Sequence, residues 1–191
     1  AHYFLHVTDT HLCFDAEAPD ICCTEQALRS LYQTAFAWDH RPAFVLITGD
    51  LVHEGTSADY ARAKTLLQEL DEQYHTKTYP ALGNHDNREN FNSAFREQAS
   101  DQPVDYCVQN EWLRWIVLDS SCGQVIGQLS GSQLAWLEQE LCDPTDCPTI
   151  LALHHPVYGT TTAETDANNL ATPDRLIRLL QDHPVDGILC G

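Results

Sequence analysis

The chain is short of cations, lacks methionine altogether and contains no long apolar run. Lysine and arginine together number 10 against 28 acidic residues. No apolar stretch reaches the roughly 18 residues that a membrane-spanning helix needs. The absence of even an initiator methionine indicates that residue 1 follows a processed or trimmed segment. Without an apolar span, a cytoplasmic protein that makes no membrane contact is the expected class.

The shortage of cations leaves a formal net charge of −18. A surface of that sign repels a phosphate backbone, so we do not expect binding to long nucleic acid. A small anionic substrate would need a local positive site, which divalent ions held by clustered carboxylates can provide. The charge therefore excludes one class of partner and leaves phosphate chemistry open.

The eight cysteines include no CxxC pair. Spacing of that kind is typical of structural zinc sites, and the adjacent Cys22 and Cys23 fit neither such a site nor a compact disulfide framework. We therefore expect mostly reduced, partly buried thiols.

Strand-like and helix-like segments alternate along the 191 residues, and no repeat or linker divides them. The predicted strands are residues 3–7, 43–48, 76–81, 115–118, 149–153 and 185–190. The predicted helices are residues 24–38, 57–73, 88–98, 133–141 and 173–181. Ser130 with Gln133 indicates a capping box, and Thr172 before Pro173 indicates an N-cap. This alternation predicts an α/β fold in a single domain over residues 1–191.

Polar residues follow four of the predicted strands at their C-terminal ends. They are Asp9 and His11, Asp50, the segment Gly83-Asn84-His85-Asp86, and His154. In open α/β sheets this edge is where ligands bind, because its loops converge while the strands hold them in position. We therefore expect the four segments to meet at one site.

Each segment offers metal-binding or acid–base groups. Asp9 and His11 are two residues apart, so in extended geometry both face the same side, although such a pair alone is usually incidental. Asp50 could bridge two cations or cap a turn. An amide ligand such as Asn84 keeps a metal more electrophilic than another carboxylate would, and His85 is then free to donate a proton. Of His154 and its neighbour His155, only one can face the site.

The motifs D-x-H, G-D, G-N-H-D and H-x-P, in that order, make the chain resemble the calcineurin-like metallophosphoesterase superfamily over essentially its whole length. The resemblance implies two mixed β-sheets packed as a sandwich flanked by helices, and a dinuclear centre that hydrolyses phosphate esters with a metal-bound hydroxide. By motif, the resemblance implies that Asp9 and His11 bind one ion and that Asn84 and His154 bind the other. It also implies that Asp50 bridges the two ions and that His85 is the acid that protonates the leaving oxygen. Asn84 would also help to hold the phosphoryl oxygens.

Residues 83–91, 118–120 and 127–137 are similar to bacterial class III cyclic-nucleotide phosphodiesterases. That likeness implies 3′,5′-cyclic AMP or a related small phosphodiester as the substrate. A phosphomonoesterase, a glycerophosphodiesterase and a non-catalytic binding protein on the same fold are the alternatives. The mixed nitrogen and oxygen ligands suit two ions of Mn, Fe, Zn or Co without choosing among them.

The sequence departs from the family pattern in two places. Many relatives have an acid three residues after the bridging aspartate, where this chain has His53 followed by Glu54, so either Glu54 or Asp86 could orient His85. The family closes its site with G-H-x-H, but the chain stops at Gly191. We therefore expect the domain to be incomplete at its C-terminus, with weak metal binding and low activity.

Asp119 also ends a strand, and we expect it to be a structural capping residue rather than a ligand.

Overall fold

The computed structural model describes residues 2–14, 24–157 and 169–191, and these form seven strands and five helices. The strands are β1 (Leu5–Val7), β2 (Val45–Thr48), β3 (Thr78–Ala81), β4 (Tyr106–Gln109), β5 (Arg114–Val117), β6 (Thr149–Ala152) and β7 (Gly187–Leu189). The helices are α1 (Thr24–Phe36), α2 (Ser57–Tyr74), α3 (Arg88–Arg96), α4 (Gly131–Cys142) and α5 (Pro173–Asp182). Every predicted element is present, with ends that shift by at most two residues.

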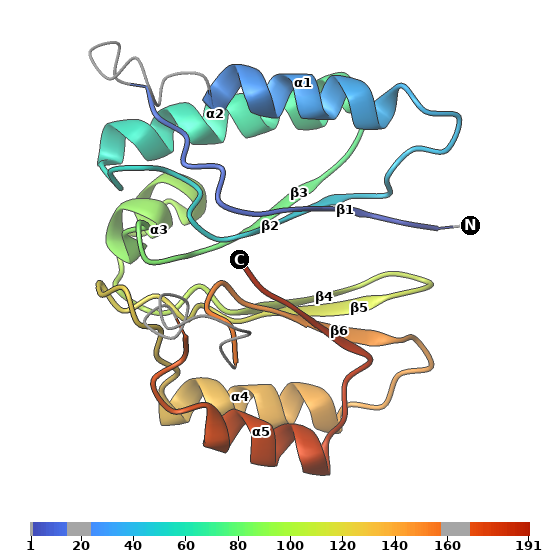
Figure 1. The fold of residues 1–191 in the computed structure, drawn as a ribbon, viewed down its shortest axis with the longest axis vertical. Coiled ribbons are helices and arrows are strands. Elements are labelled where there is room, and N and C mark those ends of the chain that lie inside the picture. Colours follow the sequence, from blue (N-terminus) through green and yellow to red (C-terminus); the bar gives the residue numbers. More distant parts are fainter. Residues whose placement is uncertain (1, 15–23, 158–168) are drawn as a thin grey trace.

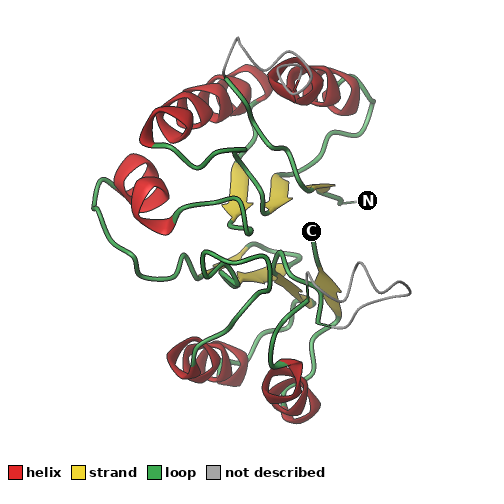
Figure 2. Cartoon of the chain, turned by 60° about the vertical axis from the view of Figure 1, so that its left-hand side comes forward, coloured by secondary structure: helices red, strands yellow, loops and turns green. Residues whose placement is uncertain are grey.

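Two sheets face each other, with helices on the outer side of each (Figure 1). One sheet has the order β1-β2-β3 with parallel pairing, and the other has the order β4-β5-β6-β7. In the second sheet β4 runs antiparallel to β5, whereas β5, β6 and β7 are parallel, so this sheet is mixed. Helices α1 and α2 cover the first sheet, and α4 and α5 cover the second (Figure 2). The predicted α/β sandwich flanked by helices is confirmed, but the first sheet is not mixed as expected, because its three described strands all pair in parallel.

Side chains alternate between two apolar layers along each central strand, as the pleat requires. On β2, Leu46 packs between the sheets, while Val45 and Ile47 pack beneath the helices of the first sheet. On β5, Trp115 packs between the sheets, while Ile116 packs beneath the helices of the second. Both faces of these strands are therefore buried, which explains their continuous apolar sequence.

Strand β4 was not predicted from the sequence. It lies at the edge of its sheet, with β5 as its partner, and its residues are only half-buried or exposed. A strand that buries neither face fully carries no continuous apolar run, so its sequence gives little signal. It forms a hairpin with β5 through a turn in which the Asn110 N–H donates to the Leu113 carbonyl.

The two predicted helix starts differ in the structure. At α4 the capping box is complete: Ser130 accepts from the Gln133 N–H, and the Gln133 side chain accepts from the Ser130 N–H. At α5, Thr172 occupies the N-cap position before Pro173, but its side chain makes no capping hydrogen bond. Its ψ of 68° departs from the extended conformation that directs a cap side chain to the first turn.

The cysteines that the structure describes are all free thiols: Cys13, Cys107, Cys122, Cys142, Cys147 and Cys190. Five of these six are buried or partly buried, as expected, whereas Cys142 is exposed. Cys22 and Cys23 lie outside the described residues.

Among the described helices, none is both long and apolar enough to cross a membrane.

Candidate metal centre

The loops after β1 and β2 continue to pair beyond the strands, and this pairing brings their polar residues together. The Asp9 N–H donates to the Gly49 carbonyl, and the His11 N–H donates to the Asp50 carbonyl. Asp9, His11 and Asp50 have φ values of 52°, 39° and 49°, so all three adopt the left-handed conformation. The extended geometry expected for Asp9 and His11 is therefore wrong. Strained backbone of this kind concentrates at functional sites.

One carboxylate oxygen of Asp50 lies between two imidazoles. Asp50 Oδ2 is 3.5 Å from His11 Nε2 and 3.5 Å from His154 Nε2, although these histidines come from loops on different sheets. The other oxygen, Oδ1, accepts a 2.9 Å hydrogen bond from the His85 N–H. Asp50 is almost completely buried, so its charge faces the site rather than solvent. This is the position that a bridging carboxylate needs.

The tautomer of His154 follows from its partners. Its Nδ1 lies 3.0 Å from the Thr48 carbonyl, which can only accept, so Nδ1 carries a proton and Nε2 is the nitrogen that has the lone pair in the neutral ring. Nε2 lies 3.1 Å from Asn84 Oδ1. Acceptors from His154, Asn84 and Asp50 therefore converge, an arrangement that a bound cation stabilises.

The remaining predicted ligands lie around the same point. Asp9, Asp50 and His154 offer ligand atoms that all lie within 4.8 Å of one another. His11 Nε2 is 3.8 Å from Asp9 Oδ1, and His11 Nδ1 is buried without a hydrogen-bond partner among the described residues. Burial lowers the pKa of His11, although the charge of Asp50 acts in the opposite direction. The lowered pKa favours the neutral imidazole, which is the form that binds a metal. The structure thus brings all five predicted ligands together.

His85 is oriented by a backbone group and by neither of the two acids considered from the sequence. Its Nδ1 lies 2.9 Å from the His53 carbonyl and donates to it, which leaves Nε2 to hold or release a proton at the surface. The Glu54 carboxylate instead lies 3.5 Å from His53 Nε2. A carbonyl is present at every residue, so the sequence held no signal for this contact.

Asp86 serves to tie loops together. It accepts hydrogen bonds from the backbone N–H groups of Leu51, Val52 and Gly83 and from the Tyr60 hydroxyl. Burial raises the pKa of the Asp86 carboxyl to about 6, against the opposing effect of these donors. Asp86 thereby holds the loop after β3 against the loop after β2, which positions the neighbouring Asn84 and His85.

Two further polar residues at strand ends point away from the centre. His155 is fully buried, with Nδ1 2.7 Å from the Ser120 hydroxyl and Nε2 3.1 Å from the Val125 carbonyl. Burial lowers its pKa to about 4, so it stays neutral. Asp119 is also fully buried and accepts from Arg88 and from the Val104 N–H, which is the structural role expected for it.

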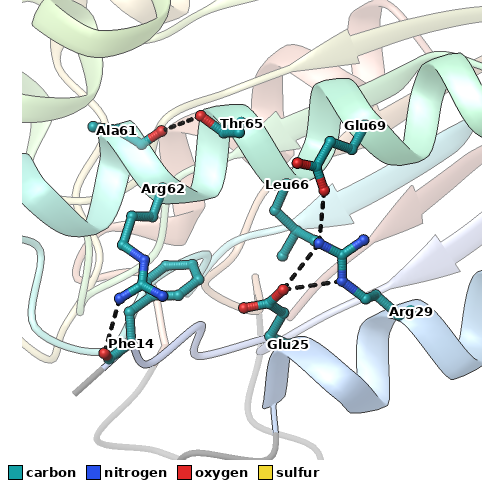
Figure 3. Close-up of a pocket in the computed structure, with 8 residues that line it drawn as sticks. All are labelled: Phe14, Glu25, Arg29, Ala61, Arg62, Thr65, Leu66 and Glu69. Atoms are coloured by element: carbon teal, nitrogen blue, oxygen red, sulfur yellow. Dashed lines mark hydrogen bonds and ion pairs between the residues drawn. The ribbon is translucent and has the colours of Figure 1, made fainter. Parts of the chain in front are cut away.

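A cavity of about 350 Å³ between α1 and α2 is lined by none of these residues (Figure 3). Arg29 there contacts both Glu25 and Glu69, and Arg62 donates to the Phe14 carbonyl. The charge of Arg29 is thus already balanced by two carboxylates. A smaller cavity of about 240 Å³ borders the centre itself and is lined by Asp9 and Thr10 together with apolar residues of α1.

Comparison with known proteins identifies relatives of the whole chain. The pattern of the family described as calcineurin-like phosphoesterase matches residues 2–191. A "probable cyclic nucleotide phosphodiesterase" of Rhodococcus erythropolis is 35% identical over 192 residues, covering 100% of this chain and 64% of that protein. A "cAMP/cGMP dual specificity phosphodiesterase" of Mycobacterium tuberculosis is 32% identical over 193 residues, covering 100% of this chain and 61% of that protein. The chain thus spans about three fifths of the length of these relatives.

Among solved structures, a dimetal phosphatase from Danio rerio is similar in fold. It superposes with a TM-score of 0.71 at 14% sequence identity, covering 95% of this chain and 78% of that one. At this identity the likeness concerns the arrangement of sheets and helices alone.

Proposed function

The chain belongs to the calcineurin-like phosphoesterase family, and from that premise we propose that it hydrolyses 3′,5′-cyclic AMP or a related small phosphodiester at a dinuclear metal centre. One observation carries the proposal: a single oxygen of Asp50 lies 3.5 Å from His11 and 3.5 Å from His154, between the two halves of the site. The likeness to two cyclic-nucleotide phosphodiesterases supports the choice of substrate class.

The donor set fits two divalent transition-metal ions. Asp9 and His11 would hold one ion, Asn84 and His154 the other, and Asp50 both. Nitrogen and oxygen donors together suit Mn, Fe, Zn or Co. When bound, such ions supply a nucleophile by lowering the pKa of water, and they neutralise charge on the phosphoryl oxygens.

The protein residues then orient the substrate and move a proton. The side-chain amide of Asn84 helps to hold a phosphoryl oxygen next to Asp50. His85, fixed at Nδ1 by the His53 carbonyl, donates the proton on Nε2 to the departing oxygen. Its side chain is exposed, so a substrate that approaches from solvent can reach it.

Charge supports a small substrate over a polymer. The net charge of −18 repels long nucleic acid over most of the surface, whereas a cyclic nucleotide needs only the local field of the bound ions.

The free thiols of the six described cysteines support a cytoplasmic location, because such thiols persist where the environment is reducing.

A substrate panel tests this function. The Mn-loaded protein should cleave 3′,5′-cyclic AMP and bis(p-nitrophenyl) phosphate, and a chelator should abolish both activities. Faster cleavage of p-nitrophenyl phosphate than of either diester would favour a phosphomonoesterase. Preferred cleavage of a glycerophosphodiester would favour that alternative, and metal binding without hydrolysis of any substrate would favour a binding protein.

A further inference from the structure

A second group of metal-binding side chains lies beside the proposed centre. His11, His53 and His85 each present a ring nitrogen, and the three nitrogens lie within 4.8 Å of one another. The ring centroids are 4.7 Å apart for His11 and His85, 5.3 Å for His53 and His85, and 5.5 Å for His11 and His53. The side chain of His53 has no part in the proposed hydrolysis, so its place in this cluster calls for a separate account.

Each ring of this cluster has a nitrogen that is free to accept a ligand. His85 Nδ1 is used by the His53 carbonyl, so Nε2 is the nitrogen that His85 can offer. Nδ1 of His11 and Nδ1 of His53 are buried and have no hydrogen-bond partner among the described residues. A buried polar atom left without a partner destabilises the fold, and a ligand held by these rings would remove that cost.

We propose that His11, His53 and His85 form a tri-imidazole site for Zn²⁺, and that zinc bound there inhibits the proposed hydrolysis. Three neutral imidazoles with an open fourth position are a ligand set typical of zinc. Mn²⁺ prefers oxygen ligands, which three of the five side chains of the dinuclear centre provide: Asp9, Asp50 and Asn84. The tri-imidazole site should therefore select zinc over Mn²⁺ more strongly than the dinuclear centre does.

Inhibition follows from the residues that the two sites share. Zinc on Nε2 of His85 occupies the lone pair that must carry the proton to the leaving oxygen. Zinc on His11 takes an imidazole from the ion that Asp9 and Asp50 would hold. Occupation of the tri-imidazole site and turnover are thus mutually exclusive, and this part of the inference rests on the proposed function.

His53→Ala separates the two sites. The substitution removes one imidazole of the tri-imidazole site and no ligand of the dinuclear centre. It also keeps the backbone carbonyl that orients His85, since that group belongs to residue 53 whatever its side chain. Glu54→Gln is the matched control, because its side chain lies 3.5 Å from His53 Nε2 but belongs to neither site. His53→Gln serves as a second variant if the alanine protein does not fold.

The experiment titrates zinc, buffered by a chelator, into each protein at saturating Mn²⁺, and measures zinc and manganese per chain by elemental analysis. Hydrolysis of bis(p-nitrophenyl) phosphate is followed in the same samples. Wild type and Glu54→Gln should bind one zinc at least about tenfold more tightly than His53→Ala does. They should lose hydrolysis over the same range of zinc, in which His53→Ala stays active.

Equal zinc affinity in wild type and His53→Ala would overturn the site. Zinc bound at the site with hydrolysis unchanged would overturn the inhibition. If no protein hydrolyses the ester with Mn²⁺ alone, the proposed function fails, but the zinc count still decides whether the site exists.

Discussion

We propose different roles for two histidines of the candidate site, although the same kind of hydrogen bond fixes both rings. The roles differ because one ring is buried and the other is exposed. His154 and His85 each donate from Nδ1 to a backbone carbonyl, of Thr48 and of His53 respectively. Both rings therefore present Nε2 to the site. His154 is buried against Asp50, where a lone pair would bind metal in the proposed centre, whereas His85 is exposed, where a proton would pass to a substrate.

We expect His85→Ala to lower turnover of 3′,5′-cyclic AMP by roughly 10²–10⁴-fold with metal content unchanged, because a general acid acts only in the transition state. The loss should be smaller for bis(p-nitrophenyl) phosphate, whose phenolate departs with little help from a proton. Steady-state kinetics and elemental analysis measure both effects. His40→Ala, an exposed and remote histidine, should match wild type. Loss of metal in His85→Ala would instead identify His85 as a ligand.

Asp50→Asn tests the bridge. The amide has nearly the same shape as the carboxylate but no charge, so two cations would lie close together without their shared anion. We expect at least one of the two ions to be lost, as measured by elemental analysis after equilibration with Mn²⁺. Asp39→Asn, on an exposed residue, is the control. Two ions retained at wild-type occupancy in Asp50→Asn would show that Asp50 is not the bridge.

At the scale of elements, the helices are positioned by short capping motifs while loops carry the site. Helix α2 begins with its own capping box, between Thr56 and Asp59, and Tyr60 in its first turn donates to Asp86. The Tyr60 hydroxyl also accepts from the Asn87 N–H, 2.8 Å away. The start of α2 is therefore linked directly to the loop that carries Asn84 and His85.

The two N-caps of the second half allow a matched comparison. Ser130→Ala removes a capping hydrogen bond from α4 and should lower the free energy of unfolding by about 1 kcal/mol. Thr172→Ala should change it much less, because the Thr172 side chain makes no capping hydrogen bond to α5. Urea unfolding followed by circular dichroism measures both. An equal loss in the two variants would contradict the difference between the caps.

At the scale of the whole molecule, the proposed centre joins the two sheets. Asp9, Asp50 and Asn84 follow strands of the first sheet, while His154 follows β6 of the second. The apolar layer between the sheets includes Leu46 from one and Trp115 from the other. This shared core supports the proposal that residues 1–191 belong to a single domain.

Because the ions would bind groups from both sheets, metal should stabilise the folded chain as a unit. Mn²⁺ at about 100 times its Kd should add about 2.7 kcal/mol to the free energy of unfolding, if the unfolded chain does not bind it. Thermal unfolding with increasing Mn²⁺ measures this as a rise in Tm. Asp50→Asn should show a smaller rise. No rise in wild type at saturating Mn²⁺ would mean that the ions do not bind across the two sheets.

The chain order of strands and helices was predictable because local patterns encode it. Buried strands such as β2 are continuous apolar runs, and caps such as Ser130 mark a helix start within a few residues. The convergence of Asp9, Asp50, Asn84 and His154 was predictable for a related reason: parallel strands bring their C-terminal ends to one edge. These features depend on residue type and spacing, which the sequence by itself determines.

Other features depend on which groups meet across long sequence separations, and only the tertiary structure decided them. The carbonyl that orients His85 and the backbone N–H groups that donate to Asp86 have no local signal, because backbone groups are the same at every residue. The closeness of the His53 ring to the His11 ring has none either, because it depends on how two separate loops pack. The left-handed backbone of Asp9 and His11 likewise arises from hydrogen bonds to the loop after β2, 40 residues away for Asp9. Edge strand β4 escaped prediction because its pairing with β5, rather than its burial, makes it a strand.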